Sequence, residues 1–207
     1  MTPAQPFYRP CELYDPNAAA TVPATLIVDF PTDRLSEVES DWQSARLQGI
    51  EWARTQGIEL DHGRWDWRNK IFRATGGIIR LIGLECKAAV QGLAAVCSDF
   101  RASRIEDGAE VVYLDYLESA AWNVQEMTPS PRHLGVGTQL LGEAIRISLV
   151  QTTGGRIGLH ALPNAELFYQ RCGMTRIGPD PHYYRLCSYE FTTAQAVAFM
   201  HSRGLPL

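Results

Sequence analysis

The chain has 207 residues, of which 45% are hydrophobic and 20% are charged. This composition supports a packed core and excludes a globally disordered chain. The 23 Asp and Glu outnumber the 19 Lys and Arg, and the net charge of −4 argues against a dedicated nucleic-acid binder. No apolar run approaches the roughly 20 residues needed to cross a bilayer, and residues 1–16 lack the charged and apolar regions of a secretory signal. We therefore expect a cytoplasmic protein that binds neither membranes nor nucleic acid.

Five cysteines bear on the cellular compartment and on metal binding. They are Cys11, Cys86, Cys97, Cys172 and Cys187. The count is odd, no two form a Cys-x-x-Cys pair and no histidine cluster flanks them, so the pattern argues against a disulfide framework or a structural zinc site. We expect reduced thiols that are mostly buried, and no metal.

The N-terminal region is predicted to hold a leader, a strand and two helices. Residues 1–24 form the leader, which prolines interrupt, and Thr25–Phe30 is rich in the apolar and β-branched residues that favour strands. Ser36 and Glu39 have the spacing of a capping box, and apolar residues then recur every three or four positions. A helix should therefore begin at this box, and a second, short helix is predicted over Trp65–Phe72.

The middle of the chain predicts three strands and one long helix. Apolar and β-branched residues dominate Ile78–Ala88, Val90–Phe100 and Glu110–Ser119, and turn signals separate these runs. This pattern indicates an antiparallel meander. The polar composition of Val124–Pro131 predicts a loop, after which an amphipathic helix led by glycine should cover residues 135–150.

The last part of the chain alternates strands and helices. Strands are predicted over Arg156–Ala161 and Tyr183–Phe191, with a short helix over Asn164–Arg171 between them. The segment 192–207 is predicted to start with a terminal helix. The element order predicts one α/β domain over residues 1–207, built on a mixed, mostly antiparallel sheet flanked by helices.

The sharpest motif is the segment Arg132–Thr138 (RHLGVGT), which leads into the long helix. Glycines let a ligand approach backbone N–H groups, and a helix N-terminus adds unpaired donors and a partial positive charge, so the segment is suited to a phosphate or pyrophosphate. A dinucleotide fingerprint would need glycine at Leu140, and a P-loop would need a lysine that is absent. The alternative is a helix that starts close against the sheet without binding an anion.

A second motif, Ala165–Met174, has the pattern Ala-x-x-Phe-Tyr-x-x-Cys-Gly-Met. Together with Arg-x-x-Gly-x-Gly at residues 132–137 and the element order, it resembles the GNAT superfamily of N-acetyltransferases. The resemblance implies a single GNAT domain whose sheet is splayed between its fourth and fifth strands.

The resemblance also implies a cofactor, acetyl-CoA, used as a co-substrate. In that superfamily the glycine loop binds the pyrophosphate, which implies that role for Arg132, His133, Leu134, Gly135, Val136, Gly137 and Thr138. Where the family commonly has an asparagine before the second motif, this chain has Leu162.

Acyl transfer to an amine needs a base, an oxyanion contact and an acid for the departing thiolate. Tyr169 stands where the family places its general acid. Glu118 is predicted to be the base, since a carboxylate in an apolar strand should be partly desolvated and its pKa raised. Asp115, His160 or a water are the alternatives. The backbone at Ser119, Ala120 and Ala121 is predicted to contact the thioester oxygen.

The predicted function is transfer of an acetyl group from acetyl-CoA to an amine by direct attack in a ternary complex. Trp122, Asn123 and His160 are predicted to line the acceptor pocket, against the alternative that they only pack or hydrogen-bond. The acceptor is an amine on a small molecule or a protein, and the prediction allows a homodimer. The alternative function is a catalytically inactive CoA-binding or protein-interaction module with the same fold.

Overall fold

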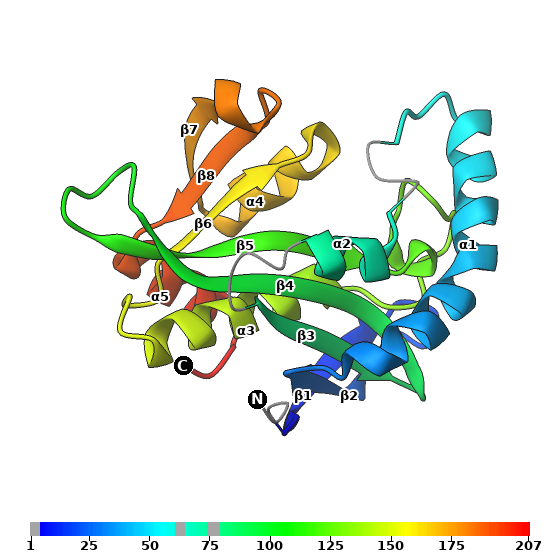
Figure 1. Cartoon of the computed structure of the whole chain (residues 1–207). Coiled ribbons are helices and arrows are strands. Elements are labelled where there is room, and N and C mark those ends of the chain that lie inside the picture. The colour runs from blue at the N-terminus through cyan, green and yellow to red at the C-terminus, as the bar shows by residue number, and fades with distance from the viewer. Residues whose placement is uncertain (1–4, 61–64, 74–78) are drawn as a thin grey trace. The chain divides into compact units, whose positions relative to one another are not determined.

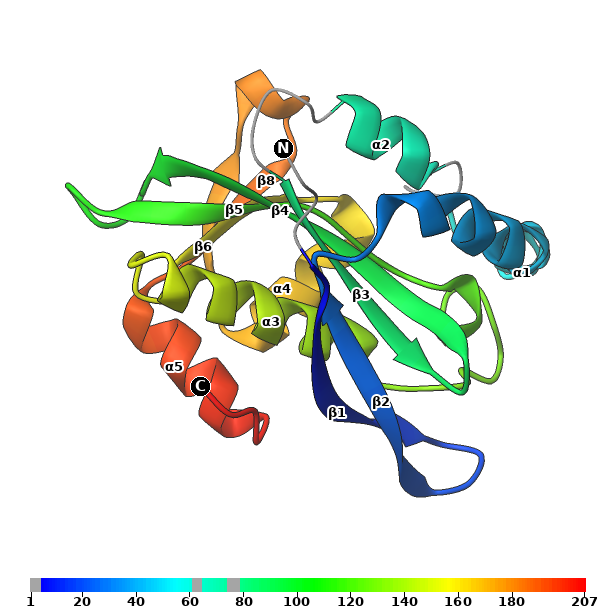
Figure 2. The same cartoon turned by 60° about the horizontal axis from the view of Figure 1, so that its bottom comes forward.

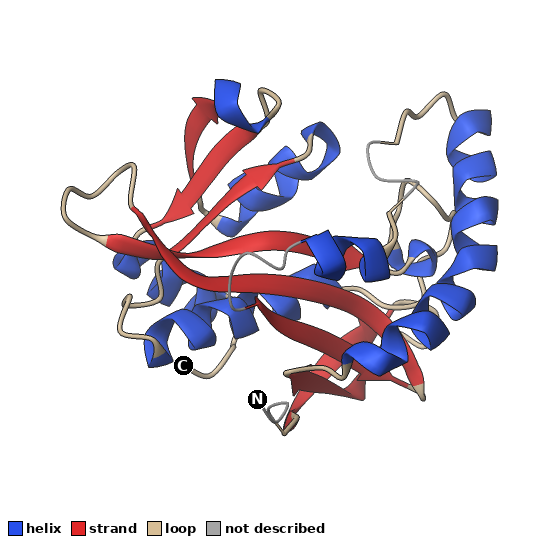
Figure 3. Cartoon of the chain, viewed as in Figure 1, coloured by secondary structure: helices blue, strands red, loops and turns tan. Residues whose placement is uncertain are grey.

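The computed structural model describes residues 5–60, 65–73 and 79–207, with strands and helices as drawn in Figures 1 and 3. Within these residues the hydrogen-bonded strand order is β1-β2-β3-β4-β5-β6-β8-β7. The strands are β1 (Phe7–Asp15), β2 (Ala20–Val28), β3 (Ile79–Cys86), β4 (Ala89–Ala102), β5 (Glu110–Ser119), β6 (Ile157–Ala161), β7 (Thr175–Pro179) and β8 (Cys187–Phe191). The helices are α1 (Leu35–Thr55), α2 (Trp67–Arg73), α3 (Val136–Val150), α4 (Glu166–Cys172) and α5 (Thr193–Ser202). This is the predicted α/β class with a mostly antiparallel sheet.

The chain forms two compact units. The first unit contains Met1–Ala95 and Tyr116–Leu140, and the second contains Val96–Asp115 and Leu141–Leu207. Three elements, β4, β5 and α3, begin in one unit and end in the other. Each unit is described by itself below.

The predicted leader contributes a hairpin to the first unit. β1 and β2 pair antiparallel from Phe7↔Val28 to Asp15↔Ala20, and they lie side by side in Figure 2. The sequence predicted a strand only from Thr25 because prolines are rare inside sheets. The hairpin contains two prolines at positions where the sheet tolerates them. Pro10 lies in β1, which is the first strand of the order, and Pro23 precedes Thr25, where the pairing of β2 with β3 begins.

Helix α1 begins differently from the prediction. A 3₁₀ turn over Thr32–Arg34 leads into it, and its N-cap, Arg34, makes no side-chain capping bond. The predicted capping box of Ser36 and Glu39 is therefore wrong. Glu39 instead lies in the second turn of the helix, where its carboxylate accepts a hydrogen bond from the Trp67 backbone N–H at 2.7 Å.

The core of the first unit forms where α1 and α2 pack against β2, β3 and β4. The indole of Trp42 on α1 is 1% exposed and donates to the Val90 carbonyl oxygen at 2.9 Å, which ties the helix to β4. Burial of such aromatic side chains supplies much of the hydrophobic stabilisation of a small domain. The buried cluster consists of Ile27, Phe30, Leu35, Val38, Trp42, Trp67, Leu81, Val90, Leu93, Ala95 and Ala120.

The second unit contains the point where the sheet changes direction. β6 pairs parallel with β5 through only Val112↔Ile157 and Tyr113↔Gly158, although β6 continues to Ala161 and stays paired with β8 throughout. These two strands are the fourth and fifth of the sequence prediction. Their short pairing in the described part of the chain agrees with the predicted splay.

The last strand was predicted too long, and β7 was missed. Tyr184 and Arg185 have φ of +53° and +61°, in the left-handed region that side chains rarely adopt. They follow a 3₁₀ turn over Pro181–Tyr183, so β8 begins only at Cys187. The segment Thr175–Pro179, which holds a glycine and a terminal proline, pairs antiparallel with β8 as the outermost strand.

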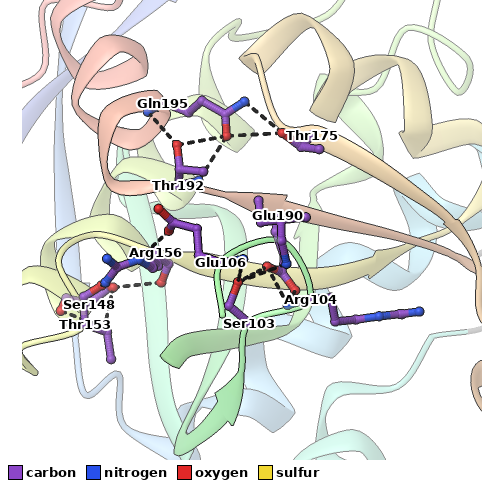
Figure 4. Close-up of polar contacts among 11 residues, drawn as sticks. Ser103, Arg104, Glu106, Ser148, Thr153, Arg156, Thr175, Glu190, Thr192 and Gln195 are labelled. Carbon is purple, nitrogen blue, oxygen red and sulfur yellow. Dashed lines mark hydrogen bonds and ion pairs between the residues drawn. The ribbon is translucent and has the colours of Figure 1, made fainter. Parts of the chain in front are cut away.

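Polar side chains fix the second unit, as Figure 4 shows. Glu190 on β8 accepts from the Ser103 hydroxyl and from the Arg104 backbone N–H, each at 2.8 Å. Thr192 and Gln195 form a capping box, with Gln195 N–H bonded to the Thr192 hydroxyl at 3.2 Å. The box starts α5 at the position that the sequence predicted.

The five cysteines are free, and four of them are buried, as predicted. Among the described helices, none has both the length and the apolar character that crossing a bilayer demands.

Candidate functional site

The glycine loop ends at the N-terminus of α3. Gly135 has φ of +92°, and its carbonyl oxygen accepts the first helical hydrogen bond, from Gln139 N–H at 3.0 Å. Because the first turn of a helix has no internal acceptors, the next three amides, at Val136, Gly137 and Thr138, lack helical partners. In the described part of the chain, none of these amides nor that of Gly135 donates to another protein group. The turn therefore offers four N–H donors and the positive end of a helix dipole.

Two amides of the predicted cradle are already bonded. The His133 N–H donates to the Asn123 side-chain oxygen at 3.0 Å, and the Leu134 N–H donates to the Tyr14 carbonyl oxygen of β1 at 2.8 Å. His133 is also buried. The roles of His133 and Leu134 in binding an anion stay predictions, and the amides without a protein acceptor in this segment are those of residues 135–138.

Two positions in this region require glycine, each for a different physical reason. A Cβ on Gly135 would meet nothing closer than the Leu13 side chain at 3.9 Å, so space does not require glycine there, whereas its positive φ does. On β4, a Cβ at Gly92 would lie 2.5 Å from the Val136 side chain and 2.9 Å from that of Leu140. Close packing of α3 thus depends on Gly92, and the loop glycine is kept for its backbone conformation.

Arg132 stands beside the loop on an aromatic support. Its exposed guanidinium lies 4.8 Å from the centre of the Trp122 ring, within the range of a cation–π contact. Its backbone N–H donates to the Trp122 carbonyl oxygen at 2.9 Å. Both contacts attach Arg132 to Trp122, three residues before Gly135 in the chain.

The predicted base, Glu118, is buried near the end of β5 with 6% exposure. The Trp67 indole N–H donates to its carboxylate at 2.6 Å, and the Arg46 guanidinium lies 3.3 Å from its other oxygen. Burial raises the pKa of Glu118 to about 7, against the lowering effects of Arg46 and Trp67. The predicted direction of the shift agrees, but its two partners were not foreseen. Arg46 is shared with Glu39, at 2.9 Å.

A pocket of about 380 Å³ opens beside this cluster, between α1 and the start of α2. The Arg46 side chain forms part of its wall and also pairs with Glu118. Trp67, in contrast, is fully buried. The lining residues are Ser36, Glu39, Ser40, Gln43, Arg46, Trp65, Asp66 and Arg68.

The alternative bases are engaged elsewhere. Asp115 lies 3.9 Å from the Arg101 guanidinium. Both ring nitrogens of His160 have partners, with Nδ1 bonded to the Tyr113 hydroxyl and Nε2 lying 3.2 Å from the Asp180 carboxylate. Burial lowers the pKa of His160, so the ring is neutral near pH 7. These bonds favour the alternative that His160 is a hydrogen-bonded structural residue, and its roles as a base or in an acceptor pocket stay predictions.

Tyr169, the predicted acid, lies on α4 with 7% exposure and packs edge-on to Phe168, with ring centres 5.1 Å apart. Burial raises the pKa of its phenol well above the ordinary value, which keeps the proton in place. No described residue hydrogen-bonds to its hydroxyl. The hydroxyl of Tyr189, in contrast, has two hydrogen-bond partners, since it donates to Glu166 at 2.7 Å and accepts from Gln170 at 2.9 Å.

The segment after β5 is held by a residue that the sequence did not single out. Trp122 and Asn123 donate to the Gln91 side-chain oxygen at 2.9 and 3.0 Å, and the Ala120 N–H donates to the Gln91 carbonyl oxygen at 2.9 Å. These bonds favour the packing alternative for Trp122 and Asn123. Of the three amides predicted for Ser119–Ala121 to contact the thioester oxygen, that of Ala120 already has this protein acceptor, and the role of the segment stays a prediction. The sequence feature that could have identified Gln91 is its position as a single amide side chain in an apolar run.

The sequence matches no protein-family model and no curated protein. Solved structures do match. The GNAT domain of PAT from S. lividans aligns with a TM-score of 0.54 and 11% identity, over 89% of this chain and 96% of that one. A bacterial toxin aligns with a TM-score of 0.50 and 16% identity, over 68% of this chain and 80% of the toxin. At such identities the likeness concerns the fold, and the chain has the fold of a GNAT domain, as its two motifs predicted.

Proposed function

We propose that the protein transfers an acetyl group from acetyl-CoA to an amine by direct attack in a ternary complex. The observation that carries the proposal is the place of Arg132-x-x-Gly135-x-Gly137 in a GNAT fold. There it starts α3, with four unpaired amides at residues 135–138. Five free cysteines suit a reducing compartment, so we assign this activity to the cytoplasm.

The pyrophosphate of the cofactor would bind at the N-terminus of α3. Its negative charges match the helix dipole and the amides from Gly135 to Thr138, and Arg132 adds a charge-assisted hydrogen bond. Glycine is the residue type that adopts the φ of Gly135 without strain. The cofactor supplies the thioester carbon that the acceptor attacks.

Two side chains would move the protons. The acceptor nitrogen forms a bond to the thioester carbon and gives a proton to the carboxylate of Glu118, whose pKa of about 7 suits a base near neutral pH. The carbon–sulfur bond then breaks, and the thiolate takes the phenol proton of Tyr169. The products are an acetylated amine and free CoA, and solvent restores both side chains.

The acceptor would be an amine on a small molecule or a protein. The polar pocket between α1 and α2 supports a polar acceptor, because its wall contains hydroxyl, amide and charged side chains. Arg46 joins this wall to Glu118, which supports entry of the acceptor from that side.

The alternative of a CoA-binding module without turnover rests on two observations. The carboxylate of Glu118 is enclosed by Arg46 and Trp67, and Leu162 replaces the asparagine that the family commonly has. Such a module would bind CoA at the same turn but release no thiol with any amine.

The test combines CoA binding by calorimetry with thiol release from acetyl-CoA in the presence of a panel of amines. Gly137→Glu places a carboxylate at the anion site and should abolish binding in a folded protein. Val150→Glu is the matched control, because it adds the same charge at the other end of α3, where Val150 is 79% exposed. A wild-type protein that does not bind CoA, or a Gly137→Glu variant that binds normally, overturns the proposal. Binding without thiol release selects the module.

A further inference from the structure

Gln91 is a buried amide near the start of β4, with 2% exposure. Its side-chain NH₂ group donates to the carbonyl oxygens of Cys86 and Ala89 at 3.0 and 3.1 Å. This assigns the orientation of the amide, so Oε1 must be the acceptor for Trp122 Nε1 and Asn123 Nδ2. Every polar atom of the side chain is therefore used, which makes its position strongly specified.

The same oxygen also sets the state of His133. His133 Nδ1 lies 3.2 Å from Gln91 Oε1, and since that atom is an acceptor, Nδ1 must carry the proton. Burial lowers the pKa of His133, which keeps the ring neutral. Nε2 is then an acceptor and lies 3.6 Å from the Cys86 thiol. The ring is fixed in one tautomer and one orientation two residues before Gly135.

Backbone groups complete the connection. The Gln91 carbonyl oxygen accepts from the Ala120 N–H, at the end of β5, and Asn123 Oδ1 accepts from the His133 N–H at 3.0 Å. One buried residue thus contacts the segment Ser119–Ala121 and, directly and through Asn123, the start of the loop 132–138.

We infer that Gln91 is a positioning residue for coenzyme A, fixing the turn at residues 135–138 through His133 and Asn123. The inference rests on the proposed function, which places the pyrophosphate at that turn. Gln91 itself would not touch the ligand. Its effect is to hold the loop so that the amides of Gly135 and Gly137 need no rearrangement when the anion binds.

Gln91→Glu gives a readout that a merely structural role would not move. When the new carboxyl is protonated, it can donate to the Cys86 or Ala89 carbonyl and still accept from its other partners. When the carboxyl ionises, an oxygen takes the place of the NH₂ donor and faces the two carbonyl oxygens. The repulsion should displace the side chain from its partners. The titratable groups that face it are His133 and Cys86. Asp15 and Lys87 act on both of these groups electrostatically, and Arg132 acts on His133.

We expect the CoA dissociation constant of Gln91→Glu to lie within about threefold of the wild type near pH 5.5. It should weaken by about tenfold or more near pH 8, with no such change in the wild type. Gln91→Met, which removes every polar atom, should weaken binding at both pH values. Gln195→Met is the control, because the Gln195 amide also has a structural role and caps α5. This variant should lose stability but keep the CoA affinity of the wild type.

Amide chemical shifts separate this inference from the proposed function, because they need no ligand. In Gln91→Met the Gly135 and Gly137 amide resonances should move, while those of Gly57 and Gly108 should not. Unchanged Gly135 and Gly137 resonances in a folded variant overturn the inference. So does a wild-type CoA dissociation constant for both Gln91 variants near pH 8. A wild-type protein that fails to bind CoA overturns the proposed function and, with it, the role of Gln91 toward CoA, although moved resonances would still show the coupling.

Discussion

The indole N–H of Trp67 donates to the carboxylate of Glu118 across 2.6 Å, although the two residues lie 51 positions apart. This bond joins α2 to the end of β5. Arg46 on α1 approaches the same carboxylate at 3.3 Å, so three elements meet at one buried acid. Its protonation therefore bears on the attachment of the two helices and, in the proposed function, on proton removal from the acceptor.

Changing Trp67 to phenylalanine should move the pH dependence of turnover. If Glu118 is the base, kcat/KM of the wild type should rise with pH and reach half its plateau near pH 7. The indole bond lowers the pKa of the carboxyl, so Trp67→Phe should shift the midpoint upward. Trp52→Phe, on α1, is the control and should leave the midpoint in place. A profile that is identical in all three proteins would exclude Glu118 as the titrating base.

Glu118 should also make the free energy of unfolding depend on pH. Its pKa is raised in the folded protein, so its contribution to stability is present below its unfolded value and is lost as pH rises through about 7. Between about pH 4.5 and 7, the wild type should lose about 3 kcal/mol relative to Glu118→Gln. Urea unfolding of both proteins across this range measures the difference. Parallel curves would show that the carboxyl titrates normally.

Tyr169→Phe should reduce kcat by about 100- to 10,000-fold while leaving stability unchanged. The reason is that its hydroxyl has no hydrogen-bond partner among the described residues, so only a proton donor is lost. Tyr189→Phe is the matched control. It breaks bonds to Glu166 and Gln170 and should lower stability by about 1–3 kcal/mol, with little effect on the rate per folded molecule. Equal rate losses in the two variants would mean that neither hydroxyl is the acid.

Gly135→Ala should weaken CoA binding beyond what its effect on stability explains. Gly57 offers the comparison, since both glycines have positive φ and neither has a close neighbour that a Cβ would meet. Each alanine should cost about 1–3 kcal/mol in thermal or urea unfolding. Only Gly135→Ala distorts the turn whose amides are proposed to bind the pyrophosphate. If calorimetry shows equal CoA affinity for the two variants, the backbone at Gly135 has no part in binding.

Local patterns predicted the parts of the molecule that short segments determine. The helix after Gly135, the helix that bears Tyr169 and the start of the terminal helix at residue 192 depend on residues within a few positions of one another, so local patterns located them. The pKa shift of Glu118 also followed from its own strand, because burial of a carboxyl acts in one direction.

Contacts between distant segments could not be predicted in this way. Glu39 has the spacing of a capping residue, but its partners are Arg46 and Trp67, and the bond to Trp67 exists only after the helices pack. Gln91 is a lone polar residue until Trp122, Asn123 and His133 are brought to it. The same holds for His160, whose partners Tyr113 and Asp180 lie 47 and 20 positions away in the chain and cannot be identified from its neighbours in sequence.

The contact between β1 and the glycine loop affects the order in which the protein is completed. Besides the Tyr14–Leu134 bridge, Gln139 on α3 donates to the Glu12 carbonyl oxygen, 127 positions earlier in the chain. During synthesis the first strand must therefore wait for most of the chain before this partner exists, and closing so long a segment is entropically slow. A fusion or deletion that disturbs residues 7–15 would consequently act on the turn at residues 135–138, so variants made for cofactor studies should leave this strand intact.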